Sequence, residues 1–191
     1  MRRWGGEGVK ETKGLLIVNI KCSSSLSTPL QIEKIEKYFS FLSGYAGVGR
    51  FIFRHEQFTF CLMGRRQTCL NITGIRKIEE IQLAVDIFNS FFPQSQIEKS
   101  SLKIDSITAR YRTSTHTVSN ILSCKSKDFW VKTYSNFSSR INIRPQQHIG
   151  QSLGISANVF SSGVCMIFGA KNVSDLGNFA DLIKYSAGKC Q

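Results

Sequence analysis

The sequence is short of carboxylates. Its 191 residues include 13 aspartates and glutamates against 25 lysines and arginines, which gives a formal net charge of +12 and an isoelectric point near 9.7. A positive surplus of this size favours an acidic partner, and nucleic acid is the commonest partner of that kind. Solubility through charge is the plain alternative, and composition alone leaves it open.

Signatures of metal binding and catalysis are also missing. The six cysteines form no Cys-x-x-Cys pair and show no Cys/His spacing suited to zinc. His55, His116 and His148 have no recognisable serine, cysteine or carboxylate companion. The glycine-bearing stretch 44–49 precedes a strand and lacks the Lys-Ser/Thr of a phosphate-binding loop. We therefore expect no enzyme, no metal or cofactor site and no small-molecule substrate.

Long apolar runs are absent as well. No stretch is long enough to span a bilayer, and the sequence shows no signal peptide, so no membrane role is expected. Unpaired cysteines fit a reducing compartment. The length suits one domain, or two fused halves of about 90 residues that share a core.

The most informative stretch is 158–171, which reads Asn-Val-Phe-Ser-Ser-Gly-Val-Cys-Met-Ile-Phe-Gly-Ala-Lys. Apolar residues on both sides of Ser161-Ser162-Gly163 predict a tight β-hairpin, and a helical pattern begins near Ser174. Because side chains alternate along a strand, one face of the hairpin should pack on a helix and the other needs a different partner. The first face holds Ile155, Ala157, Val159, Cys165 and Ile167, and the second holds Ser156, Asn158, Phe160, Val164, Met166 and Phe168.

A similar pattern occurs about half a chain earlier. In the strand 58–63, Phe58, Phe60 and Leu62 are expected inward and the residues between them outward. Thr73-Gly74-Ile75-Arg76 corresponds to Phe168-Gly169-Ala170-Lys171, and each precedes an amphipathic helical pattern. The chain therefore looks internally duplicated.

The other expected elements follow from local periodicity and from residues that cap or break helices. They include a mobile basic arm at 1–13, strands at 15–22, 50–54 and 102–108, and a short helix at 117–122. A first helix is expected from a Thr28-Pro29 capping box, with the apolar residues Ile32, Ile35, Phe39 and Leu42, and a second helix stops at Pro93 and has the apolar stripe Ile78, Ile81, Val85, Phe88 and Phe92. A final helix has Leu176, Phe179, Ala180 and Ile183 inward and is followed by Gly188.

These residues resemble the TATA-box-binding protein (TBP) family. The second half of that family carries a strand ending in Phe, a short Ser-Gly turn, an apolar strand and Gly-Ala-Lys before a long helix, and Phe160 to Lys171 fits this pattern without a gap. Ile17-Val18-Asn19-Ile20 resembles the first strand of the first half. The resemblance covers 15–189 and implies an α+β saddle, in which two pseudo-repeats form a curved antiparallel sheet with helices on the convex side. The implied organisation is a flexible arm at 1–13, a first repeat at 14–98 and a second repeat at 99–191.

The resemblance also implies a DNA interface. Phenylalanines of this family wedge between base steps in the minor groove, and the family is itself the standard illustration of such kinking. By position the wedges are Phe51, Met63, Phe137 and Phe160, where Met63 departs from the family in lacking a rigid ring. Ordinary core packing is the alternative for each phenylalanine, above all for Phe51 and Phe137.

Two further sets of residues follow from the same resemblance. Asn19 matches a central asparagine of the family, while its counterpart Ser106 has a shorter reach, so a consensus TATA preference is not assumed. The other implied minor-groove contacts are Asn71, Thr73, Thr108, Asn158, Met166 and Phe168. The implied phosphate contacts at the edge of the saddle, for which a solvated rim is the alternative, are Arg65, Arg66, Arg76, Arg110, Arg112, Arg140, Arg144 and Lys171.

The function that the resemblance implies is that of a DNA-binding general transcription initiation factor that binds and bends duplex DNA through the minor groove. A/T-rich duplex DNA is the expected nucleic-acid partner. The stretch 132–137 lacks the carboxylates with which the family meets factor B, so divergent general transcription factors or RNA polymerase are the expected partners. The expected location is the nucleus, or a cytoplasmic viral factory for a viral chain. Two alternatives stay open. The first is a TBP-fold module used for another purpose, such as binding RNA or an RNA:DNA hybrid, or serving as an accessory domain of a repair enzyme. The second is a protein interaction domain without nucleic acid.

Overall fold

The structure, a computed structural model, describes residues 14–30, 44–47, 50–63, 68–114, 121, 129–133, 140–145 and 154–188. The chain divides into two compact units. The first unit is Val18–Ser106, and the second unit is Ile107–Gln191 together with Met1–Ile17. The division falls within two strands, β1 (Leu16–Ser25) and β6 (Lys103–Arg112).

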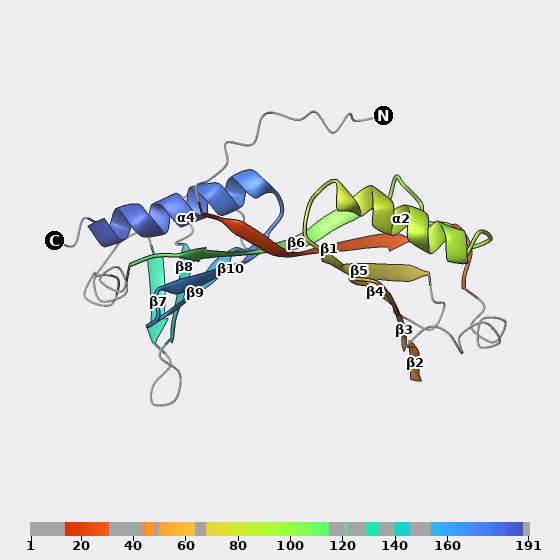
Figure 1. Cartoon of the computed structure of the whole chain (residues 1–191), viewed down its shortest axis with the longest axis horizontal. Coiled ribbons are helices and arrows are strands. Elements are labelled where there is room, and N and C mark those ends of the chain that lie inside the picture. The colour runs from red at the N-terminus through yellow and green to blue at the C-terminus, as the bar shows by residue number, and fades with distance from the viewer. Residues whose placement is uncertain are drawn as a thin grey trace. The chain divides into compact units, whose positions relative to one another are not determined.

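The first unit is an antiparallel sheet with the strand order β2-β3-β4-β5-β1. Among the described residues of this unit, the helix α2 lies along one face of these strands (Figure 1). The elements are β1 (Leu16–Ser25), β2 (Gly44–Gly47), β3 (Arg50–His55), β4 (Phe58–Met63), β5 (Cys69–Ile75) and α2 (Glu80–Phe91).

The second unit repeats this plan. Its strand order, β6-β10-β9-β8-β7, is that of the first unit with each strand replaced by its counterpart, and the pairing is again antiparallel. The helix α4 follows β10 as α2 follows β5, and it lies along one face of its own strands (Figure 1). The elements are β6 (Lys103–Arg112), β7 (Phe129–Thr133), β8 (Arg140–Pro145), β9 (Ser156–Phe160), β10 (Val164–Ala170) and α4 (Val173–Gly188).

Strand alternation decides which side chains form the core. All five residues assigned to the inner face of the 155–168 hairpin are buried, as are Phe58, Phe60 and Leu62 on β4, so these predictions are confirmed. In the first unit the core is aromatic: the rings of Phe53 and Phe60 stack with centroids 4.6 Å apart, and Phe88 of α2 lies 5.8 Å from Phe60. Each fully buried phenylalanine stabilises the fold by about 1.5–3 kcal/mol.

Two glycines show the duplication at atomic detail. Gly74 in β5 and Gly169 in β10 have φ of +89° and +85°, a conformation that L side chains rarely adopt. A Cβ atom would lie 1.9 Å from the backbone oxygen of Gln57 at Gly74, and 2.0 Å from that of Gly154 at Gly169. Each glycine also lies where its strand's pairing shifts register. Both positions therefore require glycine for the same two reasons.

The helices differ from the sequence-based expectation only near their ends. The buried stripe of α2 contains Val85 and Phe88, and the helix ends at Phe91, two residues before Pro93. The four predicted core residues of α4 are all buried. Its first turn is capped by Asn172, whose side-chain oxygen accepts from the backbone N–H of Asp175 at 2.8 Å. Gly188 is the last residue of α4 rather than the first residue after it.

Several expected elements fall outside the described residues. They are the arm at 1–13, most of the predicted helix at 28–42, and the predicted helix at 117–122 apart from Ile121, which is helical and buried. Within the part of the chain that the structure describes, neither helix is long and apolar enough to cross a membrane.

Candidate nucleic-acid interface

The non-core face of the second unit carries a row of four side chains, three polar and one apolar, that crosses four strands. Arg110 on β6 is the register partner of Met166 on β10, Met166 that of Asn158 on β9, and Asn158 that of Asn142 on β8. Their neighbours along each strand, such as Ala109 and Ile167, are buried beneath the helix side. Because side chains alternate, the four residues of the row project from the opposite face. Arg110 is exposed, and the other three are partly exposed.

Apolar and basic residues flank this row. Phe160, next but one after Asn158, is partly exposed and is the register partner of Arg140. Arg112 is exposed and pairs in register with Val164, while Arg144 is exposed on the strand that carries Asn142. The non-core face of the second unit thus combines arginines, amides and a few large apolar groups.

Asn142 and Asn158 are hydrogen-bonded to each other. Asn142 Nδ2 donates to Asn158 Oδ1 at 2.9 Å and, in a longer contact of 3.4 Å, to the backbone oxygen of Ala157. A backbone carbonyl can only accept, so this contact fixes which end of the Asn142 amide is nitrogen. The oxygen of Asn142 and the nitrogen of Asn158 have no hydrogen-bond partner among the described residues.

The first unit has three comparable rows. The residues of these rows are on β1, β5, β4 and β3 and alternate with core residues. Every one of them whose exposure the structure describes is partly or fully exposed. In register the rows are Ser25, Cys69, Met63 and Arg50; Ser23, Asn71, Cys61 and Ile52; and Thr73, Thr59 and Arg54. Met63 is 46% exposed, the most accessible large apolar side chain of these rows. It occupies the position in β4 that Phe160 occupies in β9.

Asn19 is held by the bulge of the first unit. Its Oδ1 accepts from the backbone N–H of Gly74 at 2.8 Å. Since that oxygen is engaged by a donor, the amide nitrogen is the end left to bind another molecule. Ser106 is at the corresponding position of β6 and is partly exposed.

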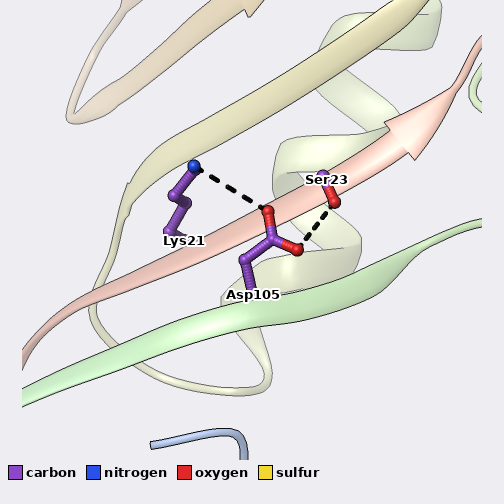
Figure 2. A network of polar contacts seen from close by, with 3 residues as sticks. All are labelled: Lys21, Ser23 and Asp105. Carbon is purple, nitrogen blue, oxygen red and sulfur yellow. Dashed lines mark hydrogen bonds and ion pairs between the residues drawn. The ribbon is translucent and has the colours of Figure 1, made fainter. Parts of the chain in front are cut away.

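The described face contains few acids, and Asp105 is paired with a cation. Its carboxylate lies 3.9 Å from Lys21 Nζ and accepts from the Ser23 hydroxyl at 2.9 Å (Figure 2). Lys21 and Ser23 come from β1, and Asp105 comes from β6 (Figure 2). The Lys21 ammonium offsets the negative charge beside the first-unit sheet, which limits its repulsion of a phosphate backbone.

The two thiols on the core face are neutral. Burial, with a smaller contribution from Asp105, raises the pKa of Cys22 to about 11. Burial also raises the pKa of Cys165 to about 11, although the neighbouring Tyr111 hydroxyl opposes this. Neither cysteine is therefore a nucleophile near pH 7. No group of three or more His, Cys, Asp or Glu side chains that could hold a metal ion occurs among the described residues.

The structure corrects one predicted wedge. Phe51 is 3% exposed and lies on the core face with Phe53, 6.0 Å between ring centroids, so its side chain packs inside the first unit and cannot reach a base step. Ile52, between them, is partly exposed. Because Phe51, Ile52 and Phe53 are all large and apolar, the sequence alone did not show which of them faces the core.

The remaining predicted residues lie as follows. Arg110 and Arg112 are exposed on the non-core face of β6, because they alternate with buried Ala109 and Tyr111. Arg76 and Lys171 are exposed directly after β5 and β10. Phe137, Arg65 and Arg66 lie outside the described residues, as does the side chain of Arg140. The predicted minor-groove residues are all partly exposed: Asn19, Asn71, Thr73, Ser106, Thr108, Asn158, Met166 and Phe168.

Sequence reasoning missed Asn142. The alternation Arg140-Ile141-Asn142-Ile143-Arg144 contains the signal, since Ile141 and Ile143 are both buried and the residues between them must face the other way. The surrounding stretch, rich in Ser, Lys and Asn, obscured this short strand.

Comparisons with known proteins identify the fold. No family model matches the chain, and no curated protein sequence matches it. Among solved structures, the chain is similar to the TBP of Methanococcus jannaschii, with a TM-score of 0.69 over 92% of this chain and 99% of that chain, at 14% sequence identity.

The chain accordingly has the TBP-like α+β fold, with two repeats of an antiparallel sheet and a helix that follows each. The predicted fold class is confirmed. An identity of 14% marks the sequence as strongly divergent from that structure.

Proposed function

We propose that this chain binds duplex DNA through the non-core faces of its two sheets, bends the duplex, and acts as a transcription initiation factor of the TBP type without catalytic activity. The observation that carries the proposal is the composition of those faces. Opposite the helices they present arginines and hydrogen-bonding side chains, with Arg110, Asn158 and Asn142 in one row. Cationic side chains suit a phosphate backbone, and amides suit base edges.

The minor groove is the favoured site of contact. Its A·T pairs present only acceptors, the N3 of adenine and the O2 of thymine. Asn19 has its oxygen occupied by Gly74, so the group it offers is a donor, which complements those acceptors. A sheet face also offers a broad, shallowly curved surface, unlike the single helix that fits the major groove.

Bending needs apolar side chains that insert between bases. Phe160 is partly exposed and Met63 is exposed. The two residues occupy equivalent positions at the ends of β9 and β4. Insertion of such groups unstacks a base step and kinks the duplex. Because Met63 has a flexible side chain in place of a ring, we expect a weaker kink at the step it contacts than at the step contacted by Phe160.

The partners proposed for this role are divergent general transcription factors or RNA polymerase, acting in the nucleus or, for a viral chain, in a cytoplasmic viral factory. The stretch 132–137 contains no carboxylate to meet a cationic factor B. Electrostatic mismatch of this kind disfavours a partner and slows its association.

The test is retention of nucleic acid by the full chain from a pool of randomised duplex DNA, with equal amounts of random duplex RNA and RNA:DNA hybrid as competitors. We expect duplex DNA to be retained, with affinity falling steeply as salt rises. Preferential retention of RNA or hybrid would favour the RNA-binding alternative. Retention of none of the three would indicate a protein interaction domain.

A further inference from the structure

We propose that the Asn142 and Asn158 pair of the second unit reads a G·C base pair in the minor groove, so that the preferred DNA site contains a G·C pair and is not composed of A·T alone. This inference rests on the proposed function. It goes beyond it by naming the base pair and the two side chains that recognise it.

The orientation of the two amides supplies the first step. Asn142 Nδ2 directs its hydrogens to Asn158 Oδ1 at 2.9 Å and to the Ala157 carbonyl at 3.4 Å, which uses both of its donors. The groups left over are Asn142 Oδ1, an acceptor, and Asn158 Nδ2, a donor. Cross-strand pairing places the two asparagines opposite each other, and both are partly exposed on the non-core face.

The minor-groove edges of the base pairs supply the second step. An A·T pair presents acceptors only, whereas a G·C pair adds the exocyclic N2 amino group of guanine, which is a donor. An acceptor on the protein therefore gains nothing from A·T and a hydrogen bond from G·C. The remaining donor, Asn158 Nδ2, suits the N3 of guanine or the O2 of cytosine. One acceptor beside one donor is complementary to a G·C edge.

The first unit lacks this arrangement at the equivalent positions. Alignment of the two bulge glycines and the strand registers makes Cys61 the counterpart of Asn158 and Ile52 the counterpart of Asn142. An isoleucine and a cysteine offer no comparable acceptor beside a donor. Arg110, in the same row as the asparagine pair, adds a positive charge for the neighbouring phosphates.

The experiment uses the full-length chain and base substitutions that remove or restore the minor-groove amino group; of these, inosine in place of guanine leaves the major-groove edge unchanged. Sites retained from the randomised duplex pool are sequenced, and the most enriched G·C position is replaced by inosine·cytosine, which lacks the N2 amino group, by A·T, or by 2,6-diaminopurine·thymine, which restores that group. We expect G·C and diaminopurine·thymine to bind alike, and inosine·cytosine and A·T to bind roughly three- to tenfold more weakly.

Protein variants assign the effect to the pair. Asn142→Val with Asn158→Val should abolish the difference between G·C and inosine·cytosine, while Asn178→Ala, which removes an exposed amide on α4, should keep it. If the double variant does not fold, the analogue series on the wild-type chain still decides the base preference.

Two results overturn the inference in distinguishable ways. If the wild-type chain retains only A·T sites, or binds inosine·cytosine as well as G·C, the proposed function stands. The Asn142 and Asn158 pair would then only stabilise the sheet and would not recognise a base pair. A wild-type chain that retains no duplex DNA removes the proposed function and this inference together.

Discussion

Asn19 Oδ1 accepts a hydrogen bond from the backbone N–H of Gly74 at 2.8 Å, at the register shift between β1 and β5. The contact links Gly74, which the fold requires at the bulge, to the Asn19 amide, which we propose contacts DNA. Gly74 adopts a positive φ at the bulge and its N–H donates to the asparagine oxygen, so the amide nitrogen is the group left to donate to another molecule.

Asn19→Asp tests the role of that nitrogen. A carboxylate oxygen can accept from Gly74 as the amide oxygen does, so the fold should be kept. The variant loses the donor and adds a negative charge, and DNA binding should weaken by roughly 1–3 kcal/mol. Titration of a fluorescent duplex measures this. Gln82→Glu on the exposed side of α2 makes the same change of charge away from the sheet face, and an equal loss of affinity in that control would contradict the assignment.

Phe160→Ala should fold normally yet bind and bend DNA poorly. Phe160 is partly exposed on the non-core face, so truncation leaves the core of the second unit intact. Loss of an unstacking wedge should weaken binding by about a few kcal/mol. Fluorescence transfer between dyes at the two ends of a duplex measures the bend. An unchanged transfer efficiency at saturating protein would show that this residue is not a wedge.

Ile167→Asp should unfold the second unit. Ile167 is fully buried on the face of β10 that packs beneath α4, and an unpaired carboxylate there costs several kcal/mol. Circular dichroism against temperature follows the loss of structure. Met166→Asp, one residue earlier and on the opposite face, is the matched control and should remain folded. Equal destabilisation of both variants, or a greater loss of stability in Met166→Asp, would contradict the assignment of the two faces.

Cys61 reports directly on the use of the first-unit face. It is partly exposed and not in a disulfide, in the row that contains Asn71 and Ile52. Bound DNA should slow its alkylation by a maleimide, measured peptide by peptide with mass spectrometry. Buried Cys22, with its pKa raised to about 11, should react slowly with or without DNA below that pH, because the thiol is the unreactive form. If DNA leaves the alkylation rate of Cys61 unchanged, this face is not where the first unit contacts DNA.

How far the sequence predicted the structure differs between the fold and the site. The 155–168 hairpin and the β4 strand were predictable residue by residue, because buried and exposed side chains alternate there without exception. The correspondence of Gly74 and Gly169 was visible as well. Their positive φ and their contacts with Gln57 and Gly154 depend on neighbouring chain segments and could not be read from the sequence.

The site was less predictable for a physical reason. In β3, Phe51, Ile52 and Phe53 are all large and apolar, so alternation alone does not say which side faces the core. The Asn142 and Asn158 pair arises from the register of β8 on β9, and the orientation of its amides arises from the Ala157 carbonyl. Such properties appear only when strands are placed beside one another.

The central claim is that the non-core sheet face, and not the helix side, binds duplex DNA. The most direct measurement is the salt dependence of DNA affinity for Arg110→Gln and Lys184→Gln. Each variant removes one positive charge from the second unit, the first from the sheet face and the second from an exposed position on α4. Lys184 forms an exposed pair with Asp181 at 3.6 Å, and its ammonium lies over the Tyr111 ring at 5.5 Å from the centroid. The loss of these two contacts should cost about 1 kcal/mol of stability or less, since each is worth little at an exposed position. We predict that Arg110→Gln weakens binding and reduces the salt slope by about one, while Lys184→Gln behaves as the wild type. The opposite pattern, or equal effects of the two substitutions, would contradict the account.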